Sequence, residues 1–300
     1  MDSQALLILA AVAAGISSSL IGVAYRLGQG RGMPTAAVLA LVALAGTVVF
    51  AVRVPADQWP RLPLSLWLLA LAAGLSQYGG VLLIAALLRR GSMTAMWCAV
   101  NLGFPVSIAY ARLFLAEPVR LPHVVATAAA VGCVLAAAQA RKPAQAGAKI
   151  AGSKAAYGLL FVSLLLANTI MPTGMKHLNA SPLECELTVQ AQLDAYAALA
   201  YAVMCACSVI HVVGRHRLAG WGWWWLAAGA LAAVGSVLCT RLIAIFTRLP
   251  AAVGFTTCSA CSILSAALFG AMLFGERRTR AWYATVILAL AAVGLVGLAR

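Results

Sequence analysis

Charged side chains are scarce in this sequence, and acidic ones are the scarcest. Only 9% of the 300 residues are charged, with 7 Asp and Glu against 21 Lys and Arg, while 64% are hydrophobic. A soluble domain of this size cannot cover its surface with so few charged groups. The composition therefore excludes a water-soluble protein and predicts that a lipid bilayer surrounds most of the chain.

Motifs of catalysis and of nucleotide binding are also lacking. The sequence has no His-Glu-x-x-His and no Gly-x-Ser-x-Gly, so an intramembrane enzyme has no support. Segment 147–154 resembles a P-loop, but its Ser and Lys stand in the wrong order and no strand precedes it. We therefore expect no enzyme and no cofactor.

Metal ligands and nucleic-acid contacts are not indicated either. The eight cysteines lie almost entirely in apolar segments, where Cys acts as a small apolar filler. Cys258 and Cys261 have no His or carboxylate nearby in sequence, so we expect no metal site. The net charge of +14 arises from Lys and Arg in short gaps between apolar runs, as in membrane-flanking segments. No nucleic-acid partner is expected.

What the sequence does contain is a series of long apolar runs. Each can cross a hydrocarbon core of ~30 Å as a helix. They predict an all-α integral membrane protein with ten transmembrane helices, near residues 4–25, 34–52, 64–88, 92–114, 121–140, 155–175, 183–213, 221–247, 250–273 and 279–299. The first run is too long, and too poor in preceding basic residues, for a cleaved signal peptide.

A short stretch near the end of the fourth run occurs again near the end of the ninth. Leu113-Phe-Leu-Ala-Glu117 and Met272-Leu-Phe-Gly-Glu276 stand 159 residues apart, and each is followed by a basic, turn-forming patch. Over the 53 positions that end at Glu117, the same offset aligns six identical pairs: Ala73 with Ala232, Leu83 with Leu242, Ile84 with Ile243, Ala85 with Ala244, Arg89 with Arg248, and Glu117 with Glu276. The offset and the matching hydropathy predict two five-helix repeats, 1–140 and 155–300, joined by a basic linker at 141–154.

Because five is an odd number, the second repeat enters the membrane from the opposite side to the first. The repeat is therefore inverted, an arrangement used by many secondary transporters. Two such units, each closing on Leu/Phe-x-Glu, resemble the EamA-type branch of the drug/metabolite transporter (DMT) superfamily. The resemblance implies a carrier with a central cavity lined by helices 1–4 and 6–9, and with helices 5 and 10 outside. Members of this family commonly have a proline in the middle of the fourth helix of each half. Pro105 fits this pattern, but its repeat partner is Leu264.

Polar side chains inside the apolar runs support the same layout. Polar groups at mid-membrane depth face protein or water rather than lipid. Spans 121–140 and 279–299 contain almost none, so we place them at the lipid-facing edge. In the other spans, the candidates for lining the cavity include Gln77, Tyr78, Trp97, Asn101 and Asn168.

Span 183–213 carries the most polar groups. Glu186, Gln190, Asp194 and Tyr201 recur at spacings of 4, 4 and 7, which places them on one helix face. An opposite face carries Glu184, Thr188, Gln192 and Tyr196, and either face could front the cavity. We prefer the first because it carries Asp194, whose insertion at a helix centre costs roughly 2.5–3.5 kcal/mol. Glu186 is alternatively a solvated helix-end acid, and Tyr201 an ordinary core aromatic.

Arg241 is the second charged group inside a span whose insertion into a membrane is energetically unfavourable. Its expected depth falls between those of Glu186 and Asp194. It therefore forms a structural ion pair with one of them, takes a substrate or coupling role, or does both. The predicted substrate-binding residues are Asp194, Arg241, Gln190, Glu186, Tyr201, Tyr78, Gln77, Trp97, Asn101 and Asn168. Asp194 is also the candidate for proton coupling, because its charge could change as the cavity switches exposure.

These residues predict a secondary transporter, with export favoured by the family resemblance. A charged wall facing amide and aromatic groups suits a small polar or zwitterionic metabolite such as an amino acid. The alternative is an organic cation, held by Asp194 and by cation–π contacts with Tyr78, Trp97 and Tyr201. The expected partners are a small-molecule substrate, the lipid bilayer and protons as candidate coupling ions, and the chain is expected to be a monomer or a weak dimer.

Two arguments give opposite orientations in an inner (plasma) membrane of bacterial type. The side that bears the linker holds 13 Lys and Arg, against 8 on the side that bears both termini. The positive-inside rule then places the linker in the cytoplasm and both termini in the periplasm. The family resemblance implies cytoplasmic termini. We prefer the orientation given by charge.

Overall fold

The computed structural model describes residues 3–88, 97, 100, 101, 103–139, 154–215, 222–276 and 278–298. Within these ranges the regular elements are all helices, which confirms the predicted all-α class. They are α1 (Ser3–Gln29), α2 (Thr35–Ala51), a 3-10 helix η1 (Ala56–Arg61), α3 (Leu64–Leu88), α5 (Phe104–Phe114), α6 (Leu121–Gln139), α7 (Lys154–Ala180), α8 (Val189–Arg215), α9 (Gly222–Phe246), α10 (Ala251–Leu273) and α11 (Arg280–Leu298). Except for Lys154, the predicted linker lies outside the described residues.

Five of the described helices are long and apolar enough to cross a membrane, namely α1, α3, α8, α9 and α10. Large apolar side chains on the outer surface point to the same environment. Val48 on α2, Leu68 on α3 and Leu226 on α9 are each more than half exposed. In water, exposed apolar surface on this scale is unfavourable. The structure is therefore that of an α-helical protein compatible with several passes through a bilayer.

Proline sets several helix boundaries. Pro34 and Pro250 immediately precede α2 and α10, and both have extended backbones. Pro105 lies in the first turn of α5, where its missing N–H leaves no helical hydrogen bond unmade. The span expected at 92–114 therefore contains a new helix start at Phe104.

The span expected at 183–213 is corrected at its beginning. Its helix, α8, starts only at Val189, and the preceding residues fold back as a loop. The Gln192 side chain fixes this loop by accepting from the Leu183 N–H at 2.9 Å and donating to the Leu183 carbonyl at 3.0 Å. Glu184 and Glu186 are consequently loop residues. Local side-chain to backbone hydrogen bonds replaced the first two helical turns expected from spacing.

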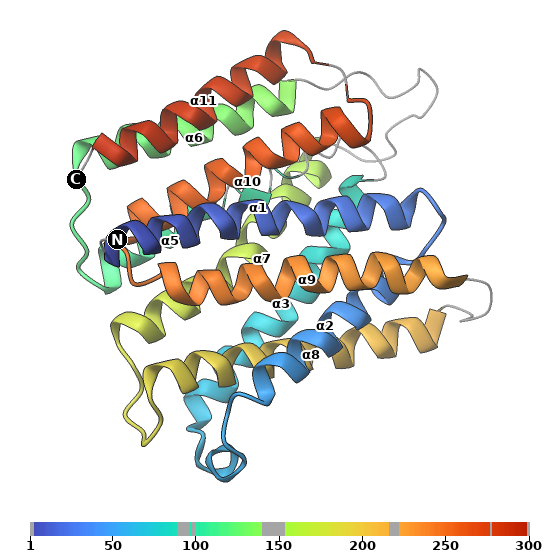
Figure 1. The fold of residues 1–300 in the computed structure, drawn as a ribbon, viewed down its shortest axis with the longest axis vertical. Coiled ribbons are helices and arrows are strands. Elements are labelled where there is room, and N and C mark those ends of the chain that lie inside the picture. The colour runs from blue at the N-terminus through green and yellow to red at the C-terminus, as the bar shows by residue number, and fades with distance from the viewer. Residues whose placement is uncertain are drawn as a thin grey trace.

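Helices from the two halves of the chain pack against each other more than against their own neighbours. α1 packs against α9 and α10, α2 against α8 and α9, and α3 against α7 and α8. α6 and α11 lie side by side at one edge of the molecule (Figure 1). Core helices thus bring residues more than 150 positions apart around one interior.

Glycines permit the closest of these helix contacts. A Cβ on Gly15 of α1 would lie 2.3 Å from the Cys258 carbonyl oxygen of α10. A Cβ on Gly74 of α3 would lie 2.5 Å from the Ala200 carbonyl oxygen of α8. Small residues at such crossings let helix backbones approach each other, as is usual in membrane bundles.

Candidate functional site

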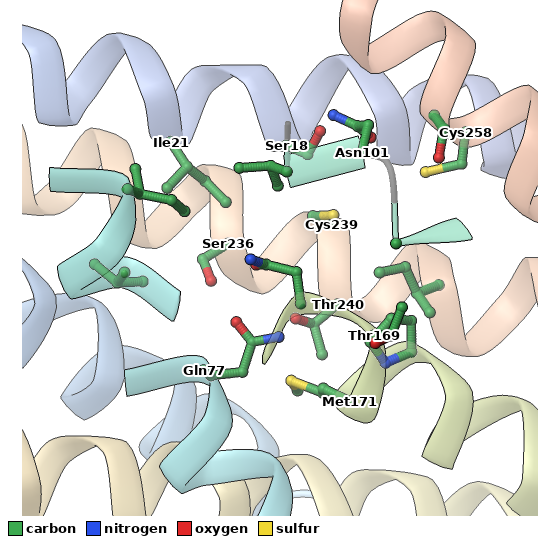
Figure 2. Close-up of a pocket in the computed structure, with 18 of the residues that line it drawn as sticks. Ser18, Ile21, Gln77, Asn101, Thr169, Met171, Ser236, Cys239, Thr240 and Cys258 are labelled. Atoms are coloured by element: carbon green, nitrogen blue, oxygen red, sulfur yellow. The ribbon is translucent and has the colours of Figure 1, made fainter. Parts of the chain in front are cut away.

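A cavity of about 190 Å³ lies in the interior between these helices. Figure 2 shows Ser18 and Asn101 on one side of this space and Gln77 and Met171 on the opposite side. Its described lining comes from α1, α2, α3, α5, α7, α8, α9 and α10 together with residues 97, 100, 101 and 103. α6 and α11 supply none of this lining, in agreement with their expected place outside the cavity.

The cavity wall is uncharged wherever the structure describes it. Hydrogen-bonding groups are provided by amides and hydroxyls, including Gln77, Asn168 and Thr240. The rest is aromatic, aliphatic or sulfur-containing, with Tyr25, Trp97, Phe104, Phe246, Phe255, Met171, Met175, Met204, Cys239 and Cys258 among the lining residues. An apolar pocket with a few polar groups is the usual character of a small-molecule site.

Five of the ten predicted site residues line this cavity: Gln77, Trp97, Asn101, Asn168 and Tyr201. Tyr201 is held most firmly. Its hydroxyl lies 2.7 Å from Ser236 Oγ and 2.8 Å from Thr240 Oγ1, and its ring stacks on Phe50 with centroids 5.8 Å apart. Gly46 makes room for this ring, because a Cβ there would lie 2.5 Å from it.

Ser262 of α10 joins Trp97 and Asn101 to α1. Its hydroxyl lies 2.6 Å from Ser18 Oγ and accepts from Trp97 Nε1 at 2.7 Å and from Asn101 Nδ2 at 3.1 Å. Ser262 was not among the predicted residues, because one Ser in an apolar run is indistinguishable from a packing residue. Only its contacts from the second half of the chain with two segments of the first half identify it as the centre of this network.

Asp194 and Arg241 form an ion pair, as one of the two sequence interpretations held. Arg241 Nη1 donates to Asp194 Oδ1 at 2.8 Å, and the exposed fractions of the two side chains are 28% and 6%. Neither residue belongs to the cavity lining. Arg241 does follow Thr240, a lining residue, so the pair lies directly behind the wall. In this conformation its charges are satisfied by each other.

The other three predicted residues also lie away from the cavity lining. Glu186 is in the loop before α8, its side chain is 79% exposed, and it pairs with Arg61 at the surface. Tyr78 turns toward α8, where its hydroxyl lies 2.6 Å from His211 Nδ1. Gln190 sits in the first turn of α8, and its Nε2 is buried without a hydrogen-bond partner. The expected four-residue polar stripe therefore reaches the cavity only through Tyr201.

A second buried ion pair, absent from the predicted site, joins Lys176 of α7 to Glu117. Lys176 also donates to the carbonyls of Thr247 at 3.0 Å and Leu249 at 2.7 Å. The sequence marked Glu117 only as a repeat position, and Lys176 fell just past the end of the predicted span 155–175. A Lys at that place looks like an ordinary solvated helix end.

The fold has a counterpart among experimentally determined structures. No family profile and no curated protein matches the sequence. A solved structure described as "Crystal structure of protein" is similar, with a TM-score of 0.68 and 16% sequence identity over 98% of this chain and 96% of that chain. Identity this low shows the fold alone. Fold and cavity together define an α-helical, membrane-type protein with an internal cavity.

Proposed function

We propose that this protein is a secondary transporter of a small, net-neutral polar metabolite, and that it works by alternating access as a ten-helix member of the EamA-type DMT carriers. The observation that carries the proposal is the cavity, which is enclosed by helices from both halves of the chain. Substrate sites at the interface of two repeats are typical of secondary transporters. Export is the preferred direction, on the family resemblance.

Recurrent packing supports the inverted repeat on which this proposal depends. α6 and α11 have the same bounds after a shift of 159 residues, and they pack against each other. The packing of α1 on α9 has its counterpart in α7 on α3, and that of α3 on α8 in α9 on α2. Such reciprocal contacts are expected when a pseudo-twofold axis relates two halves.

The described part of the cavity wall is uncharged, which favours a net-neutral substrate over a cation. Amides such as Gln77 and Asn168 can donate to and accept from the polar groups of an uncharged or zwitterionic molecule. An organic cation, the second candidate, would have only aromatic faces such as Tyr25 and Trp97 and no carboxylate along the described wall. A free cation would therefore lose hydration with little electrostatic compensation.

Coupling to protons remains assigned to Asp194. The Asp194 carboxylate pairs with Arg241, which directly follows the cavity-lining residue Thr240. A rearrangement of α8 against α9 would therefore alter the surroundings of this carboxylate. A group whose environment differs between two states binds protons differently in each. That difference is the physical requirement for coupling.

The proposal is tested first by binding and then by flux. Purified protein in detergent is heated with a panel of neutral, zwitterionic and cationic metabolites, since a ligand that binds only the folded state raises the melting temperature. We expect stabilisation by net-neutral compounds and then uptake of the same compounds into proteoliposomes. Stabilisation by cations alone would favour the second candidate. Binding without flux in either direction would contradict transport.

Reporter fusions decide the orientation. A reporter inserted at residue 148 and another at the C-terminus should fall on opposite sides of the membrane if the chain crosses it an odd number of times between them. We expect the reporter at residue 148 to be cytoplasmic, on the charge distribution. An exported reporter at that position would establish the opposite orientation.

A further inference from the structure

We infer that the Glu117–Lys176 ion pair is a gate that closes one end of the cavity. The role of a gate rests on the proposed transport function. The pair lies outside the set of residues predicted from sequence, and it differs from the Asp194–Arg241 pair in joining chain segments that surround the cavity end.

The pair joins α5, α7 and the turn between α9 and α10. Glu117 follows α5, and while one carboxylate oxygen binds Lys176, the other accepts from the Ala251 N–H at 2.6 Å, the first residue of α10. Lys176 is 3% exposed and donates to two carbonyls of the α9–α10 turn. Two side chains thus hold three segments together.

The pair is next to the cavity. Met175 and Phe246 line the cavity, and each is followed directly by a member of the cluster, Lys176 and Thr247. Consecutive Cα atoms are only about 3.8 Å apart. Lys176 and Thr247 therefore adjoin the cavity wall through their neighbours in the chain.

Further polar contacts extend this closure along α7. Thr173 Oγ1 lies 2.8 Å from Ser107 Oγ of α5, and His177 Nδ1 lies 3.0 Å from the Tyr110 hydroxyl. Asn179 donates to the Ala244 carbonyl at 3.0 Å and to Thr247 Oγ1 at 2.6 Å. These contacts and the ion pair form one seam, which runs between α7 and the ends of α5 and α9.

The chemistry of the seam suits a contact that opens and closes. A buried ion pair adds little net stability compared with an apolar contact of the same shape, because both charges must be desolvated. When such a seam opens, however, water can solvate both charges, whereas an opened apolar seam would expose hydrocarbon. A polar seam therefore keeps the free energies of the closed and open states close together, as a two-state element requires.

Cys239 provides a native reporter of closure, because it lines the cavity. In a variant that keeps Cys239 and replaces the other seven cysteines by Ser or Ala, we measure its reaction with a membrane-impermeant maleimide. The reagent is applied from the side that carries the α9–α10 turn. We expect Glu117→Gln and Lys176→Met each to increase the labelling rate at least tenfold. Unchanged rates in both variants would overturn the gate.

Glu186→Gln is the matched control. It removes an acid from another ion pair, with Arg61, in which both side chains are more than 60% exposed. Exposed pairs contribute little, so labelling should stay at the wild-type rate. An equal increase in this variant would attribute the effect to general loosening and would overturn the gate.

A crosslink tests the gate in the opposite direction and does not depend on the stability of the charge variants. Ser107→Cys and Thr173→Cys, introduced together, replace two hydroxyls that are 2.8 Å apart. We expect the disulfide to protect Cys239 from the reagent and to stop flux until reductant is added. Flux through the oxidised protein would overturn the gate. If the labelling of Cys239 depends on the ion pair but the protein transports none of the tested compounds, the closure is supported and the proposed transport is contradicted.

Discussion

Glu117 and Glu276 end their helices in the same way, although 159 residues separate them. The backbone N–H of Glu117 donates to the Ala111 carbonyl at 3.2 Å, and that of Glu276 to the Gly270 carbonyl at 3.0 Å. The residue before each glutamate has a positive φ, 53° at Ala116 and 62° at Gly275. The aligned glutamates therefore mark a repeated helix C-terminus, in which the residue before each glutamate is left-handed, as is common at helix ends.

This relationship predicts opposite effects of two reciprocal substitutions. At a left-handed position an L-residue is strained by roughly 1–2 kcal/mol, and glycine avoids this strain. Glycine loses part of the advantage because it gives the unfolded chain more conformational freedom. Ala116→Gly should therefore stabilise the protein by about 0.5–1 kcal/mol, and Gly275→Ala should destabilise it by a similar amount. No neighbouring atom lies within 4 Å of a Cβ at Gly275, so steric crowding does not contribute to the effect of Gly275→Ala. The measurement is the melting temperature in detergent, and shifts of the same sign would contradict the shared motif.

The Asp194–Arg241 pair should matter for both stability and coupling. Asp194→Asn leaves Arg241 without its counter-charge, and breaking a buried pair by changing one partner costs on the order of 3 kcal/mol. We expect a lower melting temperature with retained insertion, and a transport rate that no longer varies with pH. Asp194→Leu with Arg241→Leu should recover much of the stability. A single Asn variant with unchanged activity and an unchanged pH profile would refute the coupling role.

The contact of α1 with α10 should fail when Gly15 gains a side chain. A Cβ there would meet the Cys258 carbonyl oxygen at 2.3 Å and the Ser262 nitrogen at 2.8 Å, and backbone atoms cannot rotate away. Gly15→Ala should thus separate the helices and lower the melting temperature. Gly79→Ala is the matched control, since nothing lies within 4 Å of its Cβ and Ala favours helix. Equal melting temperatures for the two variants would contradict the close crossing.

Filling the cavity should abolish ligand binding without unfolding the protein. Val81 lines the cavity on α3, and Val81→Trp places a large ring in it. Val48→Trp is the control on α2, where the side chain is 52% exposed on the outer surface. We expect ligand-induced stabilisation to disappear only in the first variant. If Val81→Trp still binds the ligand with wild-type affinity, the substrate site lies elsewhere.

Much of the fold could be predicted because it depends on composition and period. A chain with 9% charged residues and apolar runs of about twenty residues has few alternatives to membrane helices. Polar residues in spans were also informative: Gln77, Trp97, Asn101, Asn168 and Tyr201 all line the cavity. The reason is that polar groups in apolar helices turn away from lipid.

The errors came from treating one helix as an isolated cylinder. Glu186 shares a helical face with Asp194 by spacing, yet Gln192 ties the preceding chain into a loop and moves Glu186 to the surface. Asp194 pairs with Arg241, as expected, but the two charged groups face each other and neither residue lines the cavity. The spacing of residues in the sequence shows which of them share one face of a helix. Only tertiary packing decides which residues of other segments contact that face.

The sequence by itself determined the all-helical, membrane-type architecture, the repeated glutamate ends and the expensive buried charges, because each of these follows from local composition or spacing. Tertiary structure alone decided that the described cavity wall is uncharged, that Ser262 links Trp97 and Asn101 to Ser18, and that Lys176 pairs with Glu117. The physical reason is separation along the chain. Lys176 lies on α7 and Glu117 in the segment after α5. No periodicity within either segment shows which residues of another segment will lie opposite.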